Sequence, residues 1–116
     1  MKLHEFDTLA EYQPKGHEGF ASRRLASRAM GADGSVRVSH ATVQPGGHSD
    51  IHRHETSIQI YIGLSGTLIA GNGVGEYPLA PLSAAIFEKG TDHFVENRSD
   101  EVATVLVITA PEPKRR

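Results

Sequence analysis

Residues 45–66 read PGGHSDIHRHETSIQIYIGLSG, and this stretch decides both the fold and the candidate chemistry of the chain. Side chains alternate between the two faces of an extended strand, so His52 and His54 are expected to point the same way. Two imidazoles on one face can bind one metal ion. A single strand would turn Gln59 to the opposite face, but a corner at residues 55–57 would return it toward the histidines. The stretch therefore predicts a metal site built from two short strands.

A third nitrogen ligand is required, because two imidazoles and one amide make a weak site. His93 is the candidate, within the sequence EKGTDHFVEN at residues 88–97. The three histidines together would hold a divalent metal. The alternative is that they are polar side chains on half-exposed strands.

The spacing around His52 resembles the first motif of the cupin superfamily. The matching positions are Gly46, His52, His54, Gln59 and Gly66. Gln59 stands where the family usually has Glu.

The second cupin motif is partly present. Gly90, His93 and Asn97 match it, whereas Leu82 replaces its leading Gly and Glu88 replaces its Pro. Two motifs in the right order, separated by a short spacer, make a specific signal. The resemblance implies an all-β fold, the antiparallel double-stranded β-helix or jelly-roll barrel of cupins.

The periodicity of the chain agrees with an all-β fold, since many short segments alternate and none shows a helical period. A turn is expected at residues 45–47, and hairpin turns at residues 31–34 and 71–75, where glycines tolerate positive φ. We expect strands at residues 22–30, 35–44, 58–62, 82–88, 93–97 and 102–109.

A length of 116 residues fits one domain, because domains usually hold roughly 100–200 residues. We expect residues 1–20 to form an N-terminal arm or edge strand and residues 21–116 to form the single domain, with a basic tail from about residue 111. The chain has no cysteine, which excludes disulfides, thiolate metal ligands and a thiol nucleophile.

The formal net charge of −2 gives no general attraction for nucleic acid or anionic membranes, so neither is expected as a partner. The first residues are acidic and lack the apolar core of a signal peptide. The longest apolar run, residues 102–110, is far shorter than the ~18 residues that suggest a membrane span. We therefore expect a cytoplasmic protein that acts on a small molecule.

The alternation from Ile58 to Ile62 places Gln59 and Tyr61 on one face and three isoleucines on the other. If Gln59 faces the metal, the isoleucines face outward. A bare stripe of isoleucine is uncommon on a monomer, so we expect a homodimer.

The Gln59 position is informative, because three neutral imidazoles and a neutral amide leave the full charge of a divalent ion exposed. Such an ion would be a strong Lewis acid that attracts anionic or carbonyl oxygens. Alternatively, Gln59 hydrogen-bonds a ligand histidine or a water, or Glu55 replaces it as a ligand. Imidazole-rich sites suit several transition metals, so zinc, iron, nickel, manganese and copper all remain candidates.

Five further residues are candidates for proton transfer or substrate binding beside the metal. Tyr61 is a possible proton donor and His48 a possible general base, although both could be wall or rim residues. Arg24 and Arg28 are possible clamps for a substrate carboxylate, and His40 is a further candidate for substrate contact.

The leading functional hypothesis is a metal-dependent cupin enzyme that binds a small, oxygenated, anionic substrate for non-redox isomerase or lyase chemistry. Its metal ligands would be His52, His54, Gln59 and His93. Small cupins that linearise unsaturated sugar acids are similar in their ligand set. The first alternative is a non-haem Fe(II) dioxygenase, and the second is a non-catalytic binding or sensor module.

Overall fold

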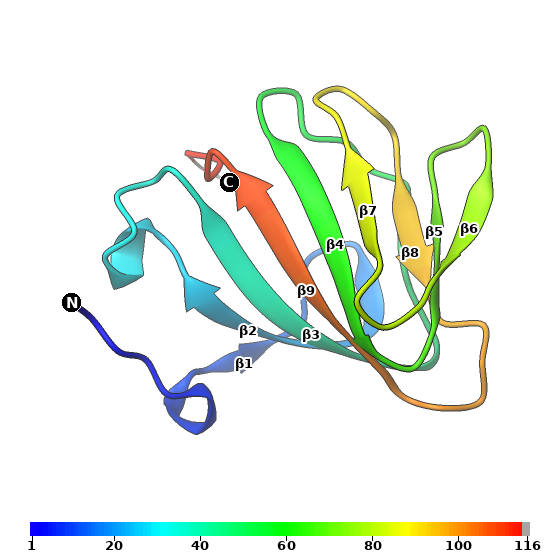
Figure 1. Cartoon of the computed structure of the whole chain (residues 1–116), viewed down its shortest axis with the longest axis horizontal. Coiled ribbons are helices and arrows are strands. Elements are labelled where there is room, and N and C mark those ends of the chain that lie inside the picture. The colour runs from blue at the N-terminus through cyan, green and yellow to red at the C-terminus, as the bar shows by residue number, and fades with distance from the viewer. Residues whose placement is uncertain (115–116) are drawn as a thin grey trace.

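Short segments of alternating burial, separated by glycine-containing turns, fold into nine strands and two 3-10 helices (Figure 1). The computed structural model describes residues 1–114. The elements are η1 (Phe6–Thr8), β1 (Glu11–Tyr12), β2 (His17–Ala26), η2 (Arg28–Met30), β3 (Arg37–Ser49), β4 (Ile58–Ser65), β5 (Leu68–Gly71), β6 (Glu76–Leu79), β7 (Ala84–Phe87), β8 (Phe94–Glu96) and β9 (Ala103–Ala110).

The longest strand, β3, organises the barrel because it pairs with three others. From Arg37 to Val43 it pairs antiparallel with β9, and along its other edge it pairs with β2. It then leaves β9 and pairs with β8 at His48. Gly46, at φ +81°, lies at this transfer, in a conformation that glycine adopts at little cost. The turn expected at residues 45–47 is thus a bend within one continuous strand, which lets β3 serve both sides of the barrel.

The strand order is β6-β5-β8-β3-β9-β4-β7, and β2 and β1 extend the sheet from the free edge of β3. Every pair is antiparallel. The sheet curls (Figure 1), so that β6 and β7 at the two ends of this order line one cavity, with Tyr77 from β6 and Ile86 from β7. The result is a nearly closed antiparallel barrel, which confirms the predicted jelly-roll class.

The barrel interior is apolar at its centre and polar toward one end. Val43, Val95 and Val105 are fully buried, and burial of the apolar core to which they belong stabilises the barrel. Gln59 and Tyr61 are buried as well, while the isoleucines of β4 lie half-buried on the outer face, as the alternation predicted.

Several strand boundaries differ from the sequence prediction. The strand expected at 22–30 begins at His17 and ends at Ala26, because residues 28–30 form η2. The strand expected at 35–44 begins at Arg37 and continues to Ser49. The other predicted strands are present with small shifts at their ends.

Two turns, one of them the turn predicted at residues 71–75, are held by side-chain amides. In the 72–75 turn, the Asn72 Oδ1 atom accepts hydrogen bonds from the backbone N–H groups of Val74 and Gly75, both at 2.9 Å. After β8, the buried Asn97 donates from Nδ2 to the carbonyl of Val43 at 3.1 Å and to that of Glu101 at 2.7 Å. Asn97 therefore ties the β8–β9 turn to β3.

The chain ends lie against the barrel. In the N-terminal arm, β1 pairs with β2. The centroid of the Phe6 ring lies 4.9 Å from that of the His40 ring and 4.5 Å from Arg23 Cζ. Near the C-terminus, Glu112 accepts a hydrogen bond from the backbone of Arg28 at 2.6 Å. The last two residues of the predicted basic tail, 115 and 116, lie outside the described residues. Within residues 1–114, no helix has the length and apolar character needed to cross a bilayer.

Candidate metal centre

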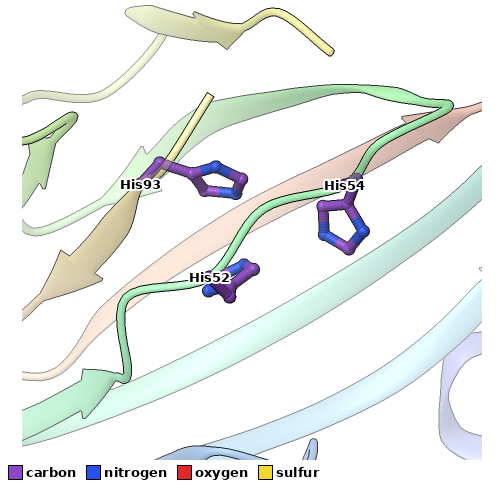
Figure 2. Close-up of side chains that lie close together, drawn as sticks. All are labelled: His52, His54 and His93. Carbon is purple, nitrogen blue, oxygen red and sulfur yellow. The ribbon is translucent and has the colours of Figure 1, made fainter. Parts of the chain in front are cut away.

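Three imidazoles converge at one end of the barrel (Figure 2). His52 and His54 lie in the segment between β3 and β4, and His93 directly precedes β8. One ring nitrogen of each lies within 4.8 Å of the other two. The ring centroids of His52 and His93 are 4.3 Å apart, and His54 is 5.4 Å from the first and 5.7 Å from the second. This spacing suits a single ion held by all three.

The main chain fixes the two distant segments against each other. The N–H of His52 donates to the carbonyl of His93 at 3.0 Å, and the N–H of His93 donates to the carbonyl of His52 at 2.8 Å. Residues paired in this way project their side chains to the same face of the ladder. A further bond of 2.9 Å, from the N–H of Gly90 to the carbonyl of His54, holds the third ligand segment. Backbone pairing therefore places the imidazoles.

Second hydrogen bonds orient two of the rings. His52 Nδ1 lies 2.9 Å from the carbonyl of Asp50, and His93 Nδ1 lies 2.9 Å from the carbonyl of Thr91. A carbonyl can only accept, so each Nδ1 carries the proton and each Nε2 keeps a lone pair. Such bonds to the second nitrogen are the usual support for a metal-binding histidine.

Gln59 completes the cluster from β4. Its Oε1 atom lies 2.7 Å from His93 Nε2, and its Nε2 atom donates to Thr109 Oγ1 at 3.0 Å. With His93 Nδ1 protonated, this arrangement makes two lone pairs face each other, and a cation between them relieves the repulsion. The opposite amide orientation would make Gln59 donate to His93 Nε2 and block that nitrogen. The two orientations correspond to the ligand role and the supporting role predicted for Gln59.

Burial keeps the cluster neutral. The pKa of His93 is lowered to about 4; burial is the main cause, the charges of His52 and His54 add to it, and the hydrogen bond to Thr91 opposes it. Burial, followed by the charges of His52 and Arg37, also lowers the pKa of His54. Neutral imidazoles are the form that binds metal, so these two residues are ready at neutral pH.

A cavity of about 440 Å³ opens in front of the cluster. His52, His54, Gln59 and Tyr61 form part of its wall, and His93 lies behind them with its ring stacked on Phe87 at 4.4 Å. Burial raises the pKa of Tyr61, so its hydroxyl stays protonated and is a donor. A small molecule in the cavity would reach the imidazoles and the phenol together.

The sequence around this centre matches the model of a known protein family. The profile of the cupin domain, Cupin_2, matches residues 39–109, more than half of the chain. The chain belongs to the cupin family. No curated protein matches this cupin.

Several solved structures resemble the chain over nearly its whole length. The TT1209 protein from Thermus thermophilus is 29% identical with a TM-score of 0.73, and the match covers 97% of this cupin and 100% of that chain. A cupin-superfamily sugar phosphate isomerase from Silicibacter pomeroyi is 25% identical with a TM-score of 0.79, covering 97% and 77%. KdgF from Halomonas sp. is 16% identical with a TM-score of 0.80, covering 97% and 96%, which shows a shared fold alone.

The cupin barrel places the other predicted site residues unequally. Arg24 lines the cavity, where its Nε and Nη2 atoms donate to the Tyr12 hydroxyl at 3.1 and 2.8 Å. Arg28 lies in η2, and neither it nor His40 is among the described residues that line the cavity. His48 is outside the lining too, because it alternates with the buried Ser49 and so faces outward.

Among the cavity residues that were not predicted from the sequence, His17 and Arg37 have side chains able to act on a substrate. His17, at the start of β2, lies 5.7 Å from His52 between ring centroids, and its Nδ1 donates to the carbonyl of Lys15 at 2.9 Å. Burial is the main cause of its lowered pKa. Arg37 begins β3 and shares the inner face with Ser39. The available signal was the small residues of that face, which mark the side turned toward the barrel interior.

Proposed function

We propose that this cupin is a metal-dependent enzyme that acts on a small oxygenated molecule without net oxidation. His52, His54, His93 and Gln59 would hold the divalent ion. The observation that carries the proposal is the convergence of one ring nitrogen from each of His52, His54 and His93, all within 4.8 Å of one another. The 2.7 Å contact between Gln59 Oε1 and His93 Nε2 supports it, because it places the amide beside the cluster.

The neutral ligand set favours Lewis acid chemistry. When bound, the ion would keep its full positive charge and would polarise a carbonyl oxygen, which acidifies the neighbouring C–H bond. Tyr61, protonated because of its burial, would donate a proton to the substrate. His17 would accept one, since its Nδ1 proton is bound to Lys15 and its Nε2 lone pair is free. Return of the proton at the adjacent atom gives isomerisation, whereas departure of a leaving group from the carbon next to the deprotonated one, with Tyr61 as its proton donor, gives lyase chemistry.

The proposal agrees with the 25% identity to a cupin sugar phosphate isomerase, which covers 97% of this chain. Fold likeness alone would not support it, because cupin-like barrels carry many reactions.

Metal analysis tests the site. The purified protein should carry about one equivalent of a divalent transition metal, and His93→Ala should lose it. His48→Ala is the matched control, because His48 makes the same type of Nδ1 bond, to the Gly46 carbonyl at 3.2 Å, but faces outward. Equal metal content in both variants would mean that His93 is not a ligand.

Deuterium exchange tests the chemistry. The metal-loaded protein is incubated without oxygen in deuterated water with a panel of keto sugars and keto acids, and NMR follows the hydrogen next to the carbonyl. Exchange that needs both the metal and Tyr61 is expected. Exchange that persists in Tyr61→Phe would remove the phenol from the mechanism.

A three-imidazole site also suits an Fe(II) dioxygenase, which is the second candidate. Oxygen uptake by the iron-loaded protein, with no anaerobic exchange, would favour it over the leading proposal. Tight ligand binding with neither reaction would indicate a binding or sensor module.

A further inference from the structure

Two arginines lie side by side on the cavity wall, away from the histidines. On β2, Arg24 is paired with Ser39 of β3, so Arg37 is its diagonal neighbour two residues along. Diagonal positions on one face of a sheet are within reach of long side chains. Both side chains line the cavity and are only partly exposed. One small group can therefore contact both guanidinium groups.

One member of the arginine pair, Arg37, shares a row of the sheet with Gln59 of the metal centre. Arg37 pairs with Thr109, and Thr109 pairs with Gln59. Strands are about 4.8 Å apart, so the Cα atoms of Arg37 and Gln59 are separated by roughly 10 Å. The charge of Arg37 is also one cause of the lowered pKa of His54. A molecule of a few carbon atoms can span the distance.

The positive charge of this pair is not balanced. Three outer arginines, Arg23, Arg53 and Arg98, each form ion pairs with carboxylates. Among residues 1–114, no carboxylate forms such a pair with Arg24 or Arg37.

Arg24 has a different partner, the hydroxyl of Tyr12, which accepts from two of its nitrogens. Burial, and next the charge of Arg24, lowers the pKa of Arg37, while the charges of Tyr12 and Glu112 oppose the shift without reversing it. Tyr12 thus fixes the direction of one guanidinium and leaves the charge of the pair free for a ligand.

We propose that Arg24 and Arg37 bind an oxyanion, a carboxylate or a phosphate, at the end of the substrate opposite its metal-binding oxygens. The substrate of this cupin is then a short bifunctional molecule rather than a neutral sugar or a simple keto acid. This inference rests on the proposed function for the identity of the metal-binding end. Tyr12 is a positioning residue that holds Arg24.

Matched pairs of 2-hydroxy acids test the arginine site. Each pair shares the hydroxyl and carboxylate that chelate a metal and differs only in a distal anion: 2-hydroxyglutarate against 2-hydroxypentanoate, and 3-phosphoglycerate against glycerate. NMR titration gives the four dissociation constants for the metal-free and the zinc-loaded protein. We expect a preference of roughly tenfold or more for one of the dianions, in both forms of the protein. Which pair shows it identifies carboxylate or phosphate.

Arginine variants test whether Arg24 and Arg37 cause the preference for the dianion. In Arg37→Met and Arg24→Met the preference should fall toward one, while the affinity for the matched acid without the distal anion stays unchanged, which also shows that the variants are folded. Arg98→Met is the control for loss of a positive charge and should keep the preference. Tyr12→Phe should weaken it in part.

Two results would overturn the inference: no preference for either dianion in the wild-type protein, or a preference that survives in both arginine variants. Failure of the proposed metal function gives a different pattern. Zinc would then leave the affinity for all four acids unchanged, while the preference for the dianion would remain.

Discussion

Acidification of the metal-free protein should weaken it strongly, because of one buried ring. His93 is 1% exposed, and burial lowers its pKa from 6.5 to about 4. Between these values the unfolded chain binds a proton that the folded chain does not, so the free energy of unfolding falls as the pH falls. It is fully restored above 6.5.

The size of the effect follows from the shift. A difference of about 2.5 pKa units corresponds to about 3 kcal/mol, lost progressively between pH 6.5 and 4. A domain of this size is usually stable by roughly 5–15 kcal/mol, so His93 alone accounts for a large fraction. His17 and His54, whose pKa values are also lowered by burial, act in the same direction.

The assay is urea unfolding in the presence of a chelator at several pH values between 4 and 7.5. His93→Asn isolates the contribution of one ring, because asparagine does not titrate in this range. The loss of stability on acidification should be smaller in the variant by about 3 kcal/mol. If the two proteins lose the same free energy, the burial of His93 does not control its protonation and the reasoning is refuted.

Three further predictions concern single side chains. Gln59→Glu should tighten metal binding at least about tenfold, because a charged ligand replaces a neutral one, and competition with a chelator measures the change. The same variant should slow anaerobic deuterium exchange. Asn97→Ala should cost ~3 kcal/mol, because two backbone carbonyls lose their donor inside the barrel, and denaturant unfolding would show it. The expected homodimer would use the outer face, where Ile86 is 64% exposed and is paired with Ile60, so Ile86→Glu should give a monomer by light scattering. A wild-type monomer at working concentration would contradict this last prediction.

The sequence predicted the three histidines of the cluster from a local spacing and from the resemblance to the two cupin motifs. Alternation relates His52 to His54, and the motif around Gly90 brings in His93 from a distant strand. The corner at residues 55–57 was predicted because an odd number of steps separates His54 from Gln59, which would place them on opposite faces of one strand. The structure has this corner: β4 begins at Ile58, and Gln59 lies beside His93.

The pairing of Arg24 with Arg37 could not be predicted from the sequence, for a physical reason. A strand of period two has two faces, and only its pairing partners decide which is buried. The face with Arg37 could be assigned only once β3 was seen paired with β2 and β9. Arg28 was a candidate to clamp a substrate carboxylate together with Arg24, but β2 ends at Ala26 and Arg28 lies in η2, outside the cavity lining.

The reciprocal hydrogen bonds between His52 and His93 use only main-chain atoms, so the scaffold of the centre does not depend on which side chains it presents. Replacing the metal-binding side chain at either position should alter the metal preference and the charge of the site while leaving the surrounding backbone intact. The same barrel can then be refitted with carboxylate, amide or imidazole donors one at a time. A site built in this way is easily redirected to new chemistry, by natural selection or by design.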